Sequence, residues 1–558
     1  MKATFDVAVV GSGFAGSLFA LLARRVGRSV VLLEKGTHPR FAIGESSSPL
    51  ANLLLEELCR RYDLSSVAPL CAWGSWQRRY PEIGCGLKRG FTFYGHETGR
   101  PFGADPDRRD QLLVAASPRD EVADTHWFRA DFDHFLQREA EREGAVYLDR
   151  TNLLACRPAP AGMRLEVERL GRPVAIDARF VLDASGPRGF LHRSLGLPES
   201  GFRGLPQTEG LYTHFENVRR MDAMLPSMGG PPPPYAADDA ALHHVFDGGW
   251  IWVLRFSNGA VSAGIAAEPR LAGTLHFDEG AASWARVLRR LPTVAEQFVE
   301  ARPLRPFVHA PRLPFRSAAA AGGDWALMPS AAAFVDPLLS TGIPLALLGI
   351  ERLIAAVEGD WGRPRFARSL EAYEAATLRD ADAAALLIAA LYASFSDFEL
   401  FGKLTLLYFA SASYAEAARR LGRPERAGSF LSADHPTFGP ELRAACDAAL
   451  EGGREGGLAA DERTRLLARI EAAIEPLDVG GFAVASRRNW HPVEAGPLLA
   501  GAGKLGVRRE DVQAMLEETG FFPAAGARGS PARSVAGRTA RGADLPERLR
   551  AGAAPRRV

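Results

Sequence analysis

Cysteine is scarce in this sequence. Its 558 residues include 5 cysteines, Cys59, Cys71, Cys85, Cys156 and Cys446, which form no CxxC pair and show no metal-ligand spacing. This pattern excludes a disulfide framework and a cysteine-based zinc site, so we expect no bound metal. A few unpaired thiols in so long a chain indicate buried, reduced cysteines and a cytoplasmic protein.

A charge imbalance and a long hydrophobic run are also lacking. The formal net charge is +1, which gives no global field that would attract nucleic acid, and no internal repeat is apparent. The longest apolar run, AAALLIAALYASF at 383–395, is too short to cross a bilayer, so we expect no membrane span. The beginning, MKATFDVAVVGSGFAGS, is basic and then apolar, but Asp6 and several glycines interrupt it, and it does not predict a signal peptide.

The composition is that of an ordinary globular protein, with 47% hydrophobic and 24% charged residues. The length predicts roughly three to four domain-sized units. Residues 130–144 read as an amphipathic helix followed by a strand, and residues 163–186 alternate with period two around a Gly-Arg turn, which predicts a hairpin. Alternating segments between about 200 and 315 predict a separate, mainly antiparallel sheet.

The second half of the chain reads differently. From Ser340 to about residue 520 it is rich in alanine and amphipathic, which predicts helices. The last 35 residues, from Ala524, hold eight arginines and two acids with no aromatic residue. They have too little apolar surface to offset the entropy of ordering, so we expect a disordered basic tail, with a basic docking arm as the alternative.

A dinucleotide-binding pattern occupies residues 4–34, which read as strand, glycine turn, helix and strand. Gly11 permits the tight turn, Gly13 allows close approach of a pyrophosphate, and Gly16 allows close helix–strand packing. Glu34 ends the second strand, where a carboxylate can accept hydrogen bonds from a ribose. We therefore expect nucleotide contacts from Gly11, Gly13, Phe14, Ala15, Gly16, Glu34 and Lys35.

Three later segments identify the kind of dinucleotide. A long loop, KGTHPRFAIGESSSPLAN, follows Glu34 where a plain dehydrogenase would continue into another βαβ unit. A strand or loop leads into a turn in two later segments, FVLDASGPRG at 180–189 and DPLLSTGIPLALL at 336–348. Together they resemble the FAD-dependent monooxygenase superfamily with the p-hydroxybenzoate-hydroxylase-type fold. Within it the chain is most similar, over about residues 5–360, to flavin-dependent halogenases and their geranylgeranyl-reductase-like relatives.

The resemblance implies an α/β fold: a Rossmann-like FAD-binding domain with an inserted antiparallel β-sheet substrate domain and a helical C-terminal region. The expected divisions are 1–200 with 316–360 for FAD, 201–315 for the substrate domain, 361–523 for the helical region and 524–558 for the tail, with 72–128 partly facing the substrate.

The resemblance also assigns cofactor contacts. The expected residues are Gly44, Glu45, Ser46, Pro49, Arg129, Asp183, Gly186, Ser330, Asp336, Gly342 and Ile343. Ser340 or Thr341 before the apolar run is typical of a helix N-cap, and amides at such a turn can hold an anion. In halogenases the equivalent Ser-Thr-Gly turn resembles a chloride site, so Ser340, Thr341 and Gly342 are the expected halide-binding residues; capping alone is the alternative.

Lys88, in GCGLKRGFTFY at 84–94, matches the lysine of the halogenase K-x-G-x-x-F pattern. The resemblance implies that its amine guides hypohalous acid to the substrate. In this strand Leu87, Phe91 and Phe93 share one face, while Lys88, Thr92 and Tyr94 share the other, which puts the amine on the more polar side, toward solvent or the lining of a tunnel. A solvated strand lysine is the alternative.

A pair of tryptophans is the second family mark. Trp250 and Trp252 in GWIWVLRF match the W-x-W-x-I-P element that is thought to screen the flavin; ordinary core packing is the alternative. Arg255 stands where proline is usual, Ser330 where the family has aspartate, and Leu339 where tryptophan halogenases have glutamate. The last difference points away from free tryptophan.

The function implied is an FAD-dependent halogenase that uses FADH2, O2 and chloride or bromide to form hypohalous acid. The expected substrate is a small electron-rich aromatic compound, such as a phenol, pyrrole or indole, either free or tethered to a carrier protein. Because the sequence shows no nicotinamide-binding domain, a separate NAD(P)H-flavin reductase would deliver the FADH2. The alternatives are a non-halogenating flavin monooxygenase, a geranylgeranyl-reductase-like oxidoreductase, and a flavin-binding protein that has lost its chemistry.

Overall fold

The computed structural model describes residues 3–522 except 104, 161 and 226–231. The predicted basic tail, 524–558, lies outside the described residues. All five cysteines are free thiols.

A mostly parallel sheet forms the N-terminal half of the nucleotide-binding region. Strands β1 (Ala3–Val10), β2 (Val30–Leu33) and β7 (Val146–Leu148) pair in parallel, and β1 also pairs in parallel with β10 (Arg172–Asp183). In the centre of the sheet β2 and residues 7–10 of β1 are continuous apolar runs, because both faces of a parallel sheet are buried there. On the far side of β10 lie β20 (Trp325–Leu327) and β19 (Ala321–Gly322).

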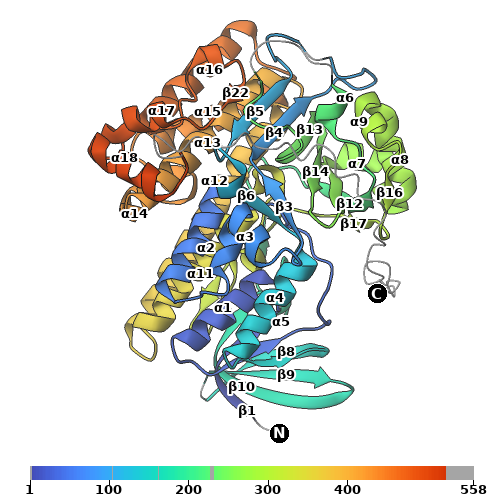
Figure 1. Ribbon diagram of the computed structural model, residues 1–558. Coiled ribbons are helices and arrows are strands. Elements are labelled where there is room, and N and C mark those ends of the chain that lie inside the picture. The colour runs from blue at the N-terminus through green and yellow to red at the C-terminus, as the bar shows by residue number, and fades with distance from the viewer. Residues whose placement is uncertain (1–2, 104, 161, 226–231, 523–558) are drawn as a thin grey trace.

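The predicted hairpin is present. Strands β8 (Thr151–Ala159) and β9 (Gly162–Arg169) pair antiparallel, and β9 pairs with the first part of β10. The end of β10 then enters the parallel sheet beside β1. Figure 1 shows this β8–β9–β10 meander at the base of the molecule, below helices α1 (Phe14–Arg25) and α4 (Arg129–Arg142).

The second large sheet contains nine strands. From one edge its order is β16 (Arg302–Pro303), β12 (Glu209–Glu216), β15 (Val261–Ala267), β14 (Gly249–Arg255), β13 (Ala241–Phe246), β4 (Gly90–Gly95), β5 (Gln111–Ala115) and β22 (Trp490–His491), while β17 (Val308–Ala310) pairs with β12. The strands from β12 to β15 are antiparallel, but β13 pairs in parallel with β4 and β22 with β5. The sheet thus combines the expected 201–315 segment with strands from residues 90–115 and 490–491.

Two small sheets and several short helices complete the first two thirds of the chain. The strands are β3 (Cys85–Lys88) with β6 (Asp124–Trp127), and β11 (Glu199–Ser200) with β18 (Phe315–Ser317) and β21 (Ala333–Phe334). The helices are α2 (Pro49–Arg61), α3 (Trp73–Arg79), α5 (Phe190–Ser194), α6 (Met221–Met224), α7 (Pro269–Leu275), α8 (Ala281–Arg290), α9 (Pro292–Gln297) and α10 (Pro329–Ala332).

The C-terminal part is helical, as predicted. Its helices are α11 (Gly342–Gly359), α12 (Arg365–Ala393), α13 (Phe398–Arg420), α14 (Pro424–Ala427), α15 (Phe438–Arg454), α16 (Ala460–Ile474), α17 (Ala495–Ala500) and α18 (Arg509–Glu518). In Figure 1 the helices α14–α18 lie on one side of the central strands β4 and β5, and α6–α9 lie on the other. One apolar core runs from α1 through α11 and α12 to α13, so the helical part continues the nucleotide-binding part.

Among the described residues one helical segment, Leu338–Gly359, is long and apolar enough to cross a membrane. However, 72% of that segment is buried inside the protein, as expected for a core helix.

Candidate active site

The glycine turn after β1 is held by close backbone contacts. Gly11 has φ +94°, and a methyl group on it would lie 2.7 Å from the Ala184 carbonyl oxygen. A methyl group on Gly16 would lie 2.0 Å from the Gly11 carbonyl oxygen. Both positions therefore require glycine, and together they bring the start of α1 against the end of β10.

Glu34 anchors this turn from the end of β2. Its buried carboxylate accepts hydrogen bonds from Ser12 N (3.1 Å) and Ser12 Oγ (2.8 Å), and it pairs with Arg40 at 3.3 Å. Burial alone would raise the pKa of Glu34, but the Arg40 charge and the hydrogen bonds from Gly36 and Ser12 outweigh it and lower that pKa. The carboxylate is therefore held charged beside the turn, while Lys35 next to it is exposed.

Arg129 joins the glycine turn to the loop after β2. Its guanidinium pairs twice with Asp133, at 2.6 and 2.8 Å, and donates to the carbonyl oxygens of Ile43 (2.9 Å) and Gly44 (3.1 Å). It also lies over the Phe14 ring, 4.9 Å from the centroid. One buried side chain thus fixes the Ile43–Gly44 loop against the first turn of α1.

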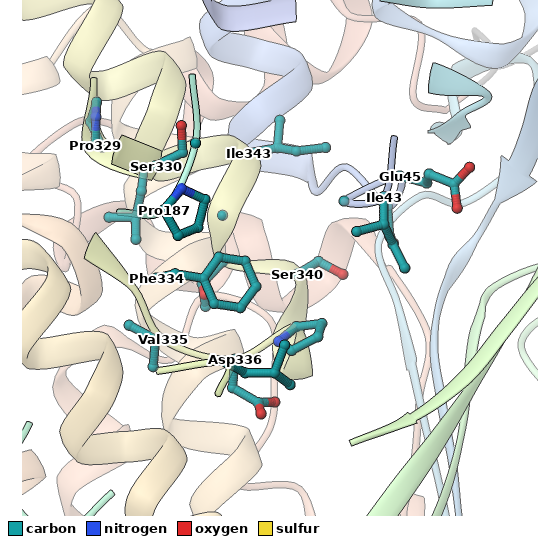
Figure 2. A pocket seen from close by; sticks show the side chains of 18 of the residues that line it. Ile43, Glu45, Pro187, Pro329, Ser330, Phe334, Val335, Asp336, Ser340 and Ile343 are labelled. Carbon is teal, nitrogen blue, oxygen red and sulfur yellow. The ribbon is translucent and has the colours of Figure 1, made fainter. Parts of the chain in front are cut away.

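A cavity of about 470 Å³ lies between this loop, the start of α1 and the start of α11. Figure 2 shows Ile43 and Glu45 on one side of it and Phe334, Asp336 and Ser340 on the other. The expected residues that line it are Gly13, Phe14, Ala15, Gly44, Glu45, Ser46, Arg129, Gly186, Trp250, Trp252, Ser330, Asp336, Ser340, Thr341, Gly342 and Ile343. Gly11, Gly16, Glu34, Lys35, Pro49, Asp183 and Lys88 are not among its lining residues.

Two of these outlying residues shape the wall from behind. Asp183 accepts hydrogen bonds from Ser185 N (2.9 Å), Ser185 Oγ (2.6 Å) and Leu191 N (2.6 Å). Its carboxylate therefore folds the 184–187 turn that lines the cavity. Pro49 is the first residue of α2, a position where its missing N–H leaves no unpaired donor.

The cavity fits a flavin dinucleotide at its α1 end. A methyl group on Gly13 would lie 3.4 Å from Arg129 Nη2 and 3.5 Å from Arg40 Nη2, so two guanidinium groups converge where the helix begins. Free amides at a helix start and two cations are the groups that bind a pyrophosphate. The Asp133 carboxylate oxygen Oδ2 lies 3.6 Å from the same position, and its charge is paired with Arg129.

A hydrogen-bonded chain fixes Trp250 in the opposite wall. Trp250 Nε1 donates to the Tyr392 hydroxyl (3.0 Å), which donates to Asp336 Oδ2 (2.9 Å). Burial raises the pKa of Asp336 to about 6, against hydrogen bonds from Leu338, Tyr392 and Thr208 that stabilise its charge. Tyr392 was missed in the sequence because it lies within the apolar run of α12, where only its hydroxyl distinguishes it from a core aromatic.

The turn before α11 has an uncommon backbone. Leu339 and Ser340 have φ values of 63° and 54°, in the left-handed region, and Thr341 returns to a right-handed conformation with φ −72° and ψ −20°. Residues with alternating handedness direct consecutive amides into one concavity, which suits an anion. Left-handed non-glycine residues are also strained, and such strain concentrates at functional sites.

The predicted face of Lys88 is wrong. The chain does not form one strand over 87–94, because β3 pairs with β6 and β4 pairs with β5 and β13, and the change of partner falls at Arg89. Lys88 consequently turns toward Phe91, with its Nζ 3.7 Å from that ring centroid. Arg89 turns away and pairs with Asp120 at 2.7 Å.

Lys88 is fully buried just behind the cavity wall. Its Nζ donates to Ser46 Oγ (2.8 Å), to the Ser47 carbonyl oxygen (2.5 Å) and to Ser340 Oγ (3.4 Å). Ser46 and Ser340 both line the cavity, so the amine bridges the loop after β2 and the turn before α11. Burial lowers the pKa of Lys88 to about 7, and the charge of Asp124 opposes this effect.

Arg255 points away from the cavity. Its Nε donates to Asp238 Oδ1 (2.9 Å) and its Nη1 to the Val218 carbonyl oxygen (2.9 Å), beyond the end of β14. The replacement of the usual proline therefore fixes a loop outside the site and leaves both tryptophans in the wall.

Two further buried residues, Asp124 and His214, were not found from the sequence. Asp124 lies opposite Lys88 in the β3–β6 pair, and Asn52 donates to its Oδ1 (3.1 Å). His214 Nε2 lies 2.9 Å from Glu45 Oε1, and Glu45 Oε2, which is buried, has no hydrogen-bond partner. Neither pairing has a local sequence signal, because the partners are far apart in the chain.

Comparison with known proteins identifies the family. The sequence model of the tryptophan halogenase family matches residues 124–397, and that of the NAD(P)-binding Rossmann-like domain matches residues 9–49. Monodechloroaminopyrrolnitrin halogenase PrnC of Pseudomonas fluorescens is 30% identical over 459 residues, which cover 78% of this chain and 77% of that protein. Tetracycline 7-halogenase of Kitasatospora aureofaciens is 30% identical over 389 residues, covering 65% of this chain and 66% of the relative.

A solved structure shows the same fold over most of the chain. The halogenase PltM in complex with phloroglucinol and FAD superposes with a TM-score of 0.75 at 25% identity, covering 87% of this chain and 99% of PltM. The Rossmann-like sheet, the second sheet and the C-terminal helices are therefore arranged as in a known FAD-binding halogenase. This chain belongs to the flavin-dependent halogenases, and it uses FAD and a halide.

Proposed function

We propose that this enzyme halogenates a small electron-rich aromatic compound other than free tryptophan, and that Lys88 guides hypohalous acid to it. The observation that carries the proposal is the position of the Lys88 amine. It lies behind the cavity wall, within hydrogen-bond distance of Ser46 Oγ and Ser340 Oγ, and it is fully buried. A donor in that place can receive an acid formed in the cavity and orient it away from water.

The cofactor would be held by the glycine turn, Arg129 and the 184–187 turn. When bound, reduced FAD supplies the electrons with which dioxygen is activated to oxidise the halide. The amides of the Ser340–Thr341–Gly342 turn are proposed to hold the halide, because they sit at the start of α11 and belong to the cavity wall.

Trp250 and Trp252 are proposed to close the cavity toward the substrate. Both are nearly fully buried, at 1% and 5% exposure, and Trp250 is fixed by Tyr392 and Asp336. A rigid aromatic wall excludes water and prevents direct contact between flavin and substrate. On this proposal hypohalous acid passes Ser46 and Ser340 to reach the Lys88 amine.

The substrate class is supported by relatives and by one residue. The relatives act on monodechloroaminopyrrolnitrin and tetracycline, and PltM has been crystallised with phloroglucinol, so aminoaryl and phenolic rings recur. A pyrrole-2-carbonyl peptidyl-carrier-protein chlorinase of Pseudomonas fluorescens is 24% identical, which keeps a carrier-tethered substrate open to test. Leu339 stands where tryptophan halogenases have glutamate, which disfavours tryptophan.

The reductant is proposed to come from a separate NAD(P)H-flavin reductase, since residues 9–49 hold the one dinucleotide fingerprint found in the sequence. Five free thiols support a reducing, cytoplasmic location, and the relatives suggest a role in bacterial secondary metabolite biosynthesis. We also propose the division into an FAD-binding part, a β-sheet substrate part and a helical part at the boundaries given above.

The test is halogenation of a substrate panel. Purified enzyme with FAD, an NAD(P)H-flavin reductase and bromide is incubated with phenols, pyrroles, indoles and tryptophan, and products are identified by mass spectrometry. We expect brominated phenol or pyrrole from wild type and none from Lys88→Ala, which should still bind and reoxidise flavin. Oxygenation without halide would instead support the monooxygenase alternative, and normal halogenation by Lys88→Ala would refute the role of the lysine.

A further inference from the structure

Asp124 is the buried partner of the proposed catalytic lysine. In the antiparallel pair of β3 and β6 it stands directly opposite Lys88. Side chains at directly opposed positions leave the same face of the strands and lie close together. Lys88 is 0% exposed and Asp124 is 6% exposed, so neither charge can be stabilised by bulk water.

The Asp124 carboxyl group is only half satisfied. Asn52 on α2 donates to Oδ1, but the buried Oδ2 has no hydrogen-bond partner. A buried carboxylate oxygen without a donor is costly, and protonation removes the charge at that oxygen. Burial, together with the nearby Glu416, raises the pKa of Asp124, and the Lys88 charge opposes this shift.

Lys88 presents the complementary situation. Its amine already donates to Ser46, Ser47 and Ser340, which satisfies an ammonium group, yet burial lowers its pKa. The pair can therefore exist as ammonium with carboxylate, or as neutral amine with carboxylic acid. Nζ contacts Ser46, Ser47 and Ser340, and the Asp124 carboxyl group contacts Asn52, so the two groups act on each other through charge: a carboxylate favours the ammonium form of Lys88, and a protonated carboxyl group favours the neutral amine.

We infer that Asp124 is a positioning residue whose buried carboxylate, opposite Lys88 in the β3–β6 pair, holds the proton on the Lys88 amine through its charge. This inference rests on the proposed function of Lys88. Donation to hypohalous acid requires a proton on nitrogen, and attack on its halogen requires the lone pair. In either case Asp124 sets the pH range in which the acting form of the lysine is present.

The surroundings contain other groups that influence the pair. From α13, Glu416 and Arg420 form an ion pair at 2.9 Å, and their opposite charges act on Asp124 in opposite directions. Two buried histidines, His126 and His243, have lowered pKa values and are neutral at pH 7, so they add no charge beside Lys88. The groups facing the pair are Asn52 on α2, His126 on β6, His243 on β13, and Tyr408, Glu416 and Arg420 on α13.

The chain is well suited to a direct measurement, because it contains five lysines: Lys2, Lys35, Lys88, Lys403 and Lys504. Protein labelled with ¹³Cε-lysine should therefore give few NMR signals, and the Lys88 signal is the one missing from Lys88→Met. We expect this signal to titrate near neutral pH in wild type. The measurement needs no cofactor and no turnover.

Asp124→Asn keeps the shape and the acceptor for Asn52 but removes the negative charge. We expect the Lys88 titration to move to lower pH by about one unit or more. Asn52→Leu removes the hydrogen bond that stabilises the carboxylate, so it should move the titration in the same direction by less. Glu139→Gln, a buried acid on α4 that binds Ser66 and Arg142, is the matched control and should leave it unchanged.

The pH profile of bromination should shift with the NMR midpoint in Asp124→Asn. An unchanged Lys88 midpoint in Asp124→Asn would overturn the role of Asp124, and if that variant does not fold, an unchanged midpoint in Asn52→Leu would do so. Failure of the proposed function would give a different result. Lys88→Met would then halogenate normally, while the Lys88 signal of the wild-type protein would still titrate near neutral pH and still shift in Asp124→Asn.

Discussion

At the scale of single residues, most of the site depends on buried polar side chains that each hold two segments together. Arg129 is the clearest case, because one guanidinium contacts Asp133 on its own helix and two carbonyl oxygens of the loop that lines the cavity. Lys88 does the same between that loop and the turn before α11. Arg129 in particular affects flavin binding through the position of the backbone rather than by direct contact alone.

Arg129→Gln should therefore weaken flavin binding. The variant removes the ion pair and leaves the buried Asp133 carboxylate unpaired, which costs about 3 kcal/mol or more of unfolding free energy. It also releases the carbonyl oxygens of Ile43 and Gly44, so we expect the FAD dissociation constant, measured by flavin fluorescence, to rise about tenfold or more.

The double variant with Asp133→Asn separates the two effects. It should recover part of the stability, since no charge is left unpaired, but not the flavin affinity. Arg142→Gln, near the end of the same helix and exposed, should change neither quantity. Wild-type FAD affinity in Arg129→Gln would show that the loop does not depend on this contact.

At the scale of elements, two of the three glycines of helix α11 have opposite surroundings. A methyl group on Gly342 would meet no atom within 4 Å, whereas one on Gly349 would lie 2.3 Å from Pro329 Cγ. Gly342 lines the cavity at the start of the helix, and Gly349 packs two turns later against α10. The same substitution should thus affect binding at one position and folding at the other.

Gly342→Ala should leave the melting temperature within a few degrees of wild type but weaken halide and flavin binding, because its methyl group enters the space in front of the amides. Gly349→Ala should lose about 1–3 kcal/mol of unfolding free energy through overpacking. Bromide titration followed by the flavin spectrum, together with thermal melting, measures both. Undiminished halide binding in Gly342→Ala would argue against the Ser340–Gly342 turn as the halide site.

The elements also show what a sequence can and cannot reveal. The glycine turn, the helix at 130–144, the 163–186 hairpin and the helices after Ser340 follow from local periodicity and turn chemistry, and the structure confirms them. The break at Arg89 does not, because it arises from two distant partners, β6 and β13, that compete for neighbouring residues. The face of Lys88, its contact with Phe91 and its pairing with Asp124 were hidden for the same reason.

At the scale of the whole molecule, buried histidines concentrate around the second sheet. His243 and His244 lie in β13, His491 in β22, His126 in β6 and His96 just after β4, and none is more than 9% exposed. Burial lowers the pKa of each of them. The folded protein therefore resists protonation at sites that the unfolded chain protonates below about pH 6.5.

The difference in proton binding between the two states determines how stability changes with pH. Below pH 6.5 the unfolded state binds more protons at these histidines than the folded state, so each one reduces stability by about 1.4 kcal/mol per pH unit as the pH falls. Four buried acids, Asp124, Asp183, Asp238 and Asp336, have raised pKa values and oppose this, since the folded state takes up protons there first. The contribution of one histidine is best isolated by comparing a variant with wild type.

His491→Gln is a suitable variant, because burial, with Arg487 and Lys403 nearby, lowers the pKa of His491 to about 3 and the residue lies outside the cavity. Whatever the variant loses in packing at pH 7, its stability relative to wild type should improve by about 2 kcal/mol between pH 6.5 and pH 5, measured by urea unfolding. If the stability difference between His491→Gln and wild type does not change with pH, this histidine can be protonated within the fold. The second sheet would then tolerate a charge that its buried surroundings should exclude.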